Sequence, residues 1–197
     1  MTGEWIIYIR VRGEVAVDSG NGLTFNLHGK DAQALPVKEV YVNGVLQISG
    51  YTFNAGSQTT AASITFISSQ TGKIVKANYR WKYETTSEEN LSVYQVEKPM
   101  NNIVEPDVNG QTLVSVSYNP VGAFKGLLTW EYMLKAFWQE WQRIAENSYL
   151  FDIETVSDTT EPETLSNLLT TGYPKYEKIP GVPGRVHVGV EFVKVTI

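Results

Sequence analysis

The sequence predicts a mainly β protein with one long helix. We expect an N-terminal antiparallel β-sandwich, followed by an α+β half in which the helix packs on a sheet. Between residues 4 and 84, short alternating segments recur at spacings of about ten residues, with turn residues between them. Residues 129–147 alone show strong helical apolar spacing. Strands do not alternate with helices, so antiparallel sheets are expected.

The composition suits a chain that folds as one large domain or two small ones. Of its 197 residues, 42% are hydrophobic and 19% are charged, which provides enough apolar material for a packed core. Residues 99–110 are rich in Pro, Asn, Asp and Gly. We therefore expect a β-sandwich domain at 1–98 and an α+β domain at 99–197.

Charge and cysteine content argue against several function classes. The net charge is −5 and the basic residues are scattered, which does not favour direct nucleic-acid binding. The chain has no cysteine, so no disulfide framework or thiolate metal site is expected. No apolar run reaches the roughly 18 residues of a membrane helix, and no signal peptide is recognised. We expect no membrane partner, and assembly or use in a cytoplasm.

The first expected strand covers residues 4–12. One of its faces carries Trp5, Ile7, Ile9 and Val11. The other face holds Ile6 and Tyr8 beside two arginines, which predicts that both faces of this strand are partly covered. Shorter alternating segments at 23–27, 51–53 and 63–67 are also expected to be strands.

The clearest turn signal is Asn43-Gly44, between two β-prone runs. A two-residue type I′ turn needs positive φ at both positions, which Asn and Gly tolerate best. This turn predicts a hairpin in which Val42 faces Val45, with the outer pairs Tyr41–Leu46 and Val40–Gln47.

Residues 73–84 form the cleanest alternation in the chain. The predicted apolar face consists of Val75, Ala77, Tyr79, Trp81 and Tyr83. The opposite face carries Lys76, Arg80 and Lys82, which we interpret as a solvated sheet face. An acidic neighbouring subunit or a polyanion is the alternative partner for this stripe.

The second half contains the predicted helix, 129–147, after strands at about 91–96 and 112–118. Its apolar stripe consists of Trp130, Leu134, Phe137, Trp138, Trp141, Ile144 and Ala145. This spacing favours core packing of the tryptophans over a sugar-stacking platform. Thr129 is the expected N-cap and Asn147 can close the helix.

The last fifty residues predict a strand at 149–153 and an acidic loop at 157–163. Residues 164–169 are expected to form one or two helical turns. The three prolines of 172–184 indicate a stiff extended segment that cannot be a central strand. The closing strand, 185–197, changes its apolar phase after Phe192, which predicts a bulge there.

The hairpin belongs to a longer run of motifs in a set order. These are Leu23-Thr24-Phe25, Pro36, Val40 through Gln47, Gly50-Tyr51-Thr52-Phe53, Ile64-Thr65-Phe66 and Gly72 through Tyr79. In order and spacing the run, about residues 13–84, resembles a β-sandwich module of bacteriophage tail-fibre and other tail or neck proteins. The second half is loosely similar to tube and ring subunits of phage tails.

This resemblance implies a virion structural protein that is assembled in the host cytoplasm. The implied partners are further copies of the chain, as a ring-type homo-oligomer, and other virion proteins. A carbohydrate- or receptor-binding module of a tail fibre or adhesin is the alternative.

Catalytic chemistry is not predicted. The titratable candidates are His28, His187 and the carboxylate pairs Glu4–Glu14 and Glu161–Glu163. His28 is expected in a loop and His187 on the less apolar face of the last strand, and metal-ligand spacing, a nucleophile elbow and a phosphate loop are all lacking. We therefore expect no enzyme, no metal and no cofactor.

Contacts between copies are expected in the long loops at about 28–36, 54–62 and 157–184. The preferred interface lies in the Pro-rich segment, because proline limits its freedom before docking. The predicted interface residues are Tyr173, Pro174, Tyr176, Ile179, Pro180, Val182 and Pro183.

Overall fold

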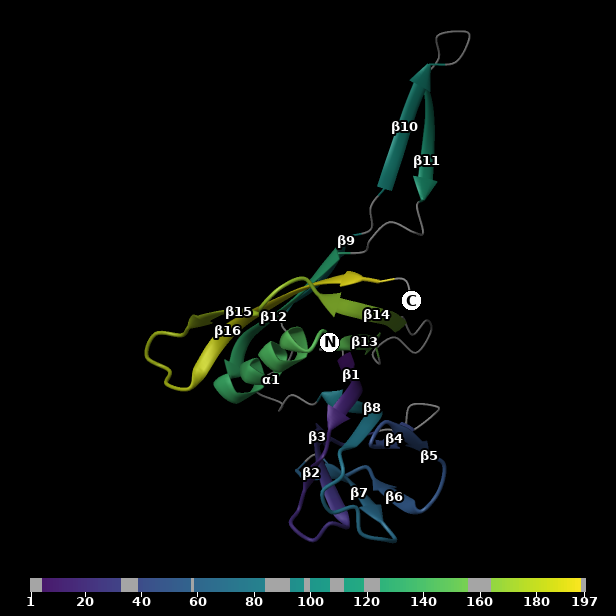
Figure 1. Cartoon of the computed structure of the whole chain (residues 1–197). Helices are drawn as coiled ribbons and strands as arrows, with labels where there is room; N and C mark the ends of the chain where they lie inside the picture. Colours follow the sequence, from purple (N-terminus) through teal and green to yellow (C-terminus); the bar gives the residue numbers. More distant parts are fainter. Residues whose placement is uncertain are drawn as a thin grey trace. The chain divides into compact units, whose positions relative to one another are not determined.

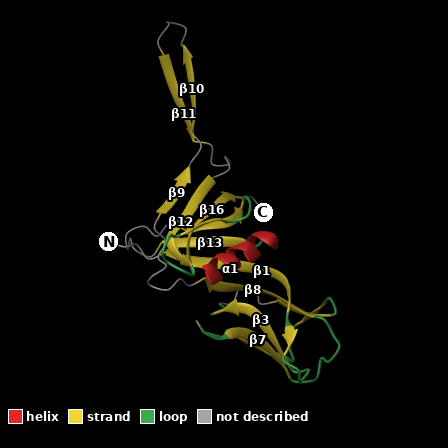
Figure 2. Ribbon diagram, turned by 90° about the vertical axis from the view of Figure 1, so that its left-hand side faces the viewer, coloured by secondary structure: helices red, strands yellow, loops and turns green. Residues whose placement is uncertain are grey.

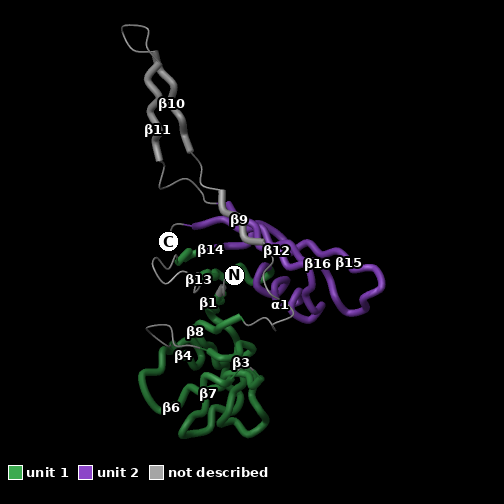
Figure 3. The backbone as a smooth tube through the Cα atoms, turned by 180° about the vertical axis from the view of Figure 1, so that it is seen from behind, with its two compact units in different colours: residues 1–87, 146–167 green, residues 88–145, 168–197 purple. Residues whose placement is uncertain are grey.

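The computed structural model describes residues 5–32, 39–57, 59–83, 93–97, 100–106, 112–118, 125–155 and 164–195. Within these ranges the protein is mainly β with a single helix, which confirms the predicted fold class (Figure 2). The chain divides into two compact units (Figure 3). Unit 1 combines residues 1–87 with 146–167, and unit 2 combines residues 88–145 with 168–197.

The predicted boundary between residues 98 and 99 lies outside the described residues. The units differ from the predicted domains in one respect that can be described. Residues 146–167 belong to unit 1, although they were predicted to belong to the α+β domain at 99–197. Their strand β13 (Leu150–Thr155) pairs with β1 (Trp5–Val15), so a late segment of the chain joins the sheet that contains the first strand.

Unit 1 is a β-sandwich of two antiparallel sheets. The first has the order β5 (Val45–Gln47), β4 (Glu39–Val42), β8 (Val75–Tyr83), β1 and β13. The second has the order β2 (Val17–Asp18), β3 (Thr24–Lys30), β7 (Ala61–Phe66) and β6 (Tyr51–Asn54). Figure 1 labels these strands.

Tyr79 connects the two sheets of unit 1. Its ring is fully buried and lies 6.2 Å from the ring of Phe53 on the opposite sheet. Its hydroxyl accepts a hydrogen bond from the Gly29 amide at 2.9 Å and donates one to Glu14. A Cβ on Gly29 would lie 2.5 Å from the Tyr79 ring, so only glycine allows this close approach of β3 to β8.

The hairpin register is confirmed. Strands β4 and β5 pair through Val42–Val45, Tyr41–Leu46 and Val40–Gln47. Asn43 and Gly44 have φ values of +50° and +83°, as a type I′ turn requires.

The predicted faces of the two longest sandwich strands are also confirmed. The five apolar side chains of β8 are all buried, whereas Lys76, on the opposite face, is exposed. In β1 both Ile7 and Tyr8 are buried, so both faces of this strand are covered in part.

Unit 2 is built on an antiparallel sheet. Strand β12 (Lys125–Leu134) pairs with β9 (Val93–Glu97) on one edge and with β16 (Arg185–Lys194) on the other. β16 also pairs with the end of β14 (Thr164–Thr170) and with β15 (Lys175–Lys178). β10 (Met100–Pro106) and β11 (Thr112–Tyr118) form a separate antiparallel pair, and β11 lies where a strand was predicted.

The helix α1 covers Lys135–Glu146, and the predicted start at Thr129 is wrong. Residues 129–134 belong to β12, where Thr129 pairs with Gly189 and Trp130 with Val188. Cross-strand pairing on this β-prone run therefore prevails over its helical spacing. The buried rings of Trp130 and Trp141 lie 5.5 Å apart, which packs the helix on the sheet through the predicted stripe.

Two further predictions for the C-terminal part of the chain are wrong. Residues 164–169 lie in strand β14 instead of helical turns. No bulge occurs at Phe192, which pairs with Gly126 in an unbroken run of β16 residues. The bulge in this pair of strands lies on β12 instead, which has one extra residue between Trp130 and Met133. The Phe192 ring is buried over Gly126, where a Cβ would lie 2.1 Å from its Cζ.

Candidate functional site

The predicted interface segment, 173–184, forms strand β15 and two Pro-Gly turns. Val182 N donates to Ile179 O at 3.3 Å across the first turn. Gly181 has a φ of +76°, and Pro followed by Gly at its two central positions is the pattern of a type II turn. In the second turn Gly184 has a φ of +79°, and its carbonyl accepts a hydrogen bond from Lys135 N at 3.1 Å.

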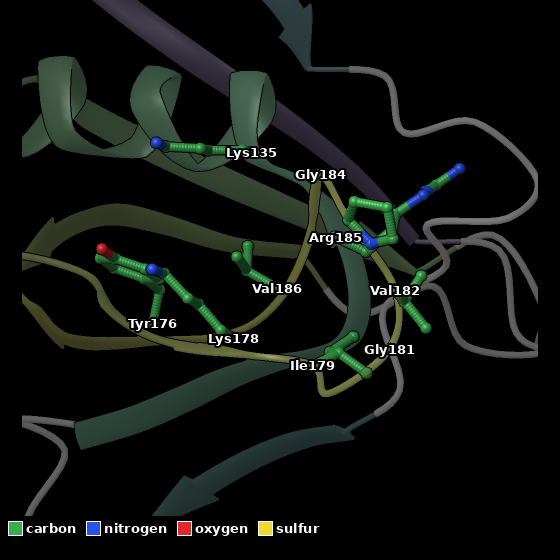
Figure 4. Close-up of a pocket in the computed structure, with 10 residues that line it drawn as sticks. Lys135, Tyr176, Lys178, Ile179, Gly181, Val182, Gly184, Arg185 and Val186 are labelled. Carbon is green, nitrogen blue, oxygen red and sulfur yellow. The ribbon is translucent and has the colours of Figure 1, made fainter.

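These turns border a pocket of about 460 Å³ beside the start of α1 (Figure 4). We call it the arm pocket. Its lining residues are Lys135, Tyr176, Lys178, Ile179, Gly181, Val182, Pro183, Gly184, Arg185 and Val186. The structure thus brings four of the seven predicted interface residues to one concave site.

The other three predicted residues lie outside the arm pocket. Pro174 is buried, and its carbonyl accepts a hydrogen bond from Trp138 Nε1 at 3.1 Å. Tyr173 and Pro180 are exposed, with Tyr173 at 66%. The role of all seven residues as an interface stays a prediction.

The wall formed by Tyr176 is held by the core of unit 2. Its ring lies 4.2 Å from the ring of Trp138, a residue that is only 9% exposed. Strand β15 alternates, so Tyr176 and Lys178 line the pocket while Lys175 and Glu177 do not. The pocket therefore has a rigid aromatic side before any partner arrives.

The lining of the arm pocket is cationic, with two lysines, one arginine and no carboxylate. Figure 4 shows Lys135 and Lys178 extending to the same side, while Arg185 points to the other. Arg185 Nη1 donates to Tyr132 O at 3.3 Å, and its guanidinium lies 5.1 Å from the Tyr132 ring centroid. Within the described part of the chain, neither lysine has an ion pair.

A third lysine, Lys175 of β15, already has an acidic partner. Lys175 Nζ lies 2.8 Å from Glu191 Oε1. This hydrogen bond raises the pKa of Lys175 above 10.5 and lowers the pKa of Glu191 below 4.5. The contrast identifies Lys135 and Lys178 as the cations still available to an anionic partner.

A second surface, on unit 1, was not predicted. Large apolar side chains are exposed around the outer hairpin strand, and they belong to Val45, Leu46, Ile48, Ile67 and Ile74. We call this set the apolar edge. Ile48 and Ile67 are 92% and 85% exposed. Backbone hydrogen bonds join Asn43 with Ile74 and Gly50 with Ile67, which gathers the set around the hairpin.

The sequence carried a signal for this edge. Three apolar residues occur between 45 and 48, on a strand that the hairpin prediction placed beside β4 but gave no further neighbour. β5 is the end strand of its sheet, so nothing within the described sheet covers its outer side.

Three titratable candidates, His28, His187 and Glu14, lie within the described residues. His28 lies on strand β3 rather than in a loop, and its side chain is exposed. His187 is exposed on β16, on the predicted face. Glu14 binds Tyr79 and the His28 amide, while Glu4, Glu161 and Glu163 lie outside the described residues.

Arg80, one residue of the basic stripe of β8, meets acids of its own unit. Arg80 Nη2 lies 2.8 Å from Glu154 Oε1, and its guanidinium lies 3.6 Å from the Tyr8 ring centroid. Arg80 therefore contributes to packing in unit 1. Among the residues that the structure describes, no cluster of three or more His, Asp and Glu could hold a metal ion. In the same ranges no helix has the length and apolarity needed to cross a membrane.

No family model, curated protein or solved structure that was compared with this chain matches it.

Proposed function

We propose that this chain is a structural protein of a phage tail or neck that acts through its surfaces. It assembles with further copies, in the manner of a ring, and binds other virion proteins. The order of sandwich motifs between residues 23 and 79 supports the virion assignment. In this proposal the protein is not an enzyme, and it is assembled in the host cytoplasm.

The observation that carries self-assembly is the apolar edge. Monomeric soluble proteins rarely leave large contiguous apolar patches in water, and exposed patches often mark interaction sites. Here the exposed side chains surround an end strand, whose free backbone groups favour pairing with another chain. Burial of a side chain such as Ile48 would contribute about 1.5–3 kcal/mol.

The test is the mass of the protein in solution, by light scattering after size-exclusion chromatography, with negative-stain images. We expect an oligomer, and rings or tubes in the images. The double variant Ile48→Lys with Ile67→Lys should have a smaller mass and an unchanged circular dichroism spectrum. Val17→Lys is the control, because Val17 is 68% exposed but lies on β2, which pairs with β3 and is not part of the hairpin.

A monomer at every concentration would overturn self-assembly. An oligomer that is insensitive to both edge substitutions would remove the apolar edge as its cause. A second candidate, glycan or receptor binding, has support from exposed tyrosines of unit 2, which are Tyr132, Tyr173 and Tyr176. A monomer that binds on a glycan array would favour that candidate.

A further inference from the structure

We propose that the arm pocket receives carboxylate side chains of the acidic run 158–163 from a second copy of this chain. This inference rests on the proposed self-assembly and names one of its contacts. It begins with the two unpaired lysines, Lys135 and Lys178, which extend to one side of a pocket that has no lining carboxylate.

The pocket has the features of a preformed docking site. Two Pro-Gly turns hold its rim, and the hydrogen bond from Lys135 N to Gly184 O joins the rim to the start of α1. Tyr176 is fixed against Trp138. A partner therefore orders few groups of this copy on binding, which lowers the entropic cost of association.

Charge complementarity selects the occupant. The chain carries a net charge of −5, so a second copy is itself an acidic partner. The run 158–163 contains Asp158, Glu161 and Glu163, and no lysine or arginine occurs between Arg143 and Lys175. The nearby acids Asp152 and Glu154 already bind arginines of unit 1, so they are not available to a neighbour.

Lysine and carboxylate side chains suit this contact chemically. Ion pairs across an interface guide encounter and fix orientation, and removal of one charge leaves the other without its partner. The apolar lining residues Ile179, Val182 and Val186 can accommodate the aliphatic parts of glutamate side chains. The interaction is reversible and needs no covalent step.

The experiment uses charge reversal in the full-length chain. Variant P carries Lys135→Glu and Lys178→Glu. Variant R carries Asp158→Lys, Glu161→Lys and Glu163→Lys. We expect each variant alone to lose the oligomer peak in light scattering. In P an acidic pocket meets the acidic run of the next copy, and in R a basic run meets the basic pocket of the next copy. An equimolar mixture of P and R should form an oligomer again, since every P–R contact joins opposite charges. Its mass should equal that of the wild type where the wild-type ring has an even number of subunits.

The controls separate folding, charge and intramolecular effects. The exposed pair Lys30→Glu with Lys76→Glu matches the charge change of P but lies on unit 1, and it should keep the oligomer. The neutral pair Lys135→Gln with Lys178→Gln should weaken assembly less than P. If the run bound the pocket of its own chain, the mixture of P and R would not regain the oligomer. A single chain carrying both sets of changes would regain it.

Several outcomes would overturn the inference. If the wild-type oligomer forms and P retains it, the arm pocket is not a contact, although self-assembly stands. A monomeric wild type removes self-assembly itself. If P retains the oligomer but loses binding to a single-stranded oligonucleotide that the wild type retards in a gel, the pocket serves a polyanion instead.

Discussion

Replacing Asp152 with alanine should lower the free energy of unfolding by about 3–5 kcal/mol, the range for breaking a buried ion pair. The side chain is only 2% exposed. Its Oδ2 lies 2.7 Å from Arg10 Nε and 3.9 Å from Arg80 Nε, and its Oδ1 accepts the Asn167 amide at 3.0 Å. The substitution leaves Arg10 Nε and the Asn167 amide without their buried acceptor.

The neighbours of Asp152 limit the size of this effect. Arg80 keeps Glu154 at 2.8 Å, and Arg10 keeps the Asn167 side-chain carbonyl at 2.8 Å. The loss therefore comes mainly from one charged hydrogen bond at about 1.5–3 kcal/mol and one unsatisfied amide at about 1–3 kcal/mol. Asp152→Asn should cost less, since an amide oxygen can still accept one of these bonds.

Urea unfolding followed by far-UV circular dichroism measures the change. Glu191→Gln is the matched control, because Glu191 and Lys175 form an ion pair of similar length with side chains 57% and 80% exposed. Exposed pairs contribute little to stability, so the control should leave the midpoint almost unchanged. The reasoning fails if Asp152→Ala and the control shift the midpoint equally.

Three further predictions test the packing and the hairpin. Trp138→Ala should lower the free energy of unfolding by about 3–5 kcal/mol in urea melts, and an unchanged melt would remove α1 from the core. Gly126→Ala should cost about 1–3 kcal/mol in the same assay, because its Cβ would collide with Phe192, and an unaltered midpoint would contradict that packing. The hydrogen bond to Glu39 raises the pKa of Tyr41 above 10.0, so its stabilising effect is present below pH 10 and is lost as the pH rises through the folded value. Tyrosinate absorbance, compared with Tyr41→Phe, should show this late titration, and Glu39→Gln should bring it back toward pH 10.

The parts of the fold that could be predicted are those determined by local geometry. Asn43-Gly44 specifies a two-residue turn, and a two-residue turn specifies the pairing on both sides of it. The long alternation of β8 likewise leaves one choice of buried face. These elements depend on residues within about ten positions of each other, which a periodic pattern can represent.

The errors occur where distant segments decide the conformation. Residues 129–134 have helical spacing, yet their backbone pairs with β16, more than fifty positions later in the chain. Residues 164–169 mix three leucines with three polar residues and are ambiguous alone, and the end of their strand pairs with β16 from Leu168 onward. Local patterns contain no information about these partners.

The arm pocket shows the same limit. The prolines of 173–184 predicted a stiff segment, and the Pro-Gly pairs make its two turns. The pocket also needs Lys135, which lies almost fifty positions before Gly184 in the sequence. A backbone hydrogen bond from Lys135 to Gly184 brings it to the segment 173–184. A sequence pattern could indicate the rim but not the cationic side chain opposite it.

The proposed contact has a consequence for symmetry. The arm pocket and the run 158–163 are different surfaces of one chain, so their contact is heterologous, and repetition gives a closed ring or an open filament. In the mixture of the two charge-reversed variants, each P must lie between two R copies. A closed mixed ring therefore contains an even number of subunits. If the wild-type ring has an odd number, the mixture should form open or differently sized assemblies, which images and mass would both reveal.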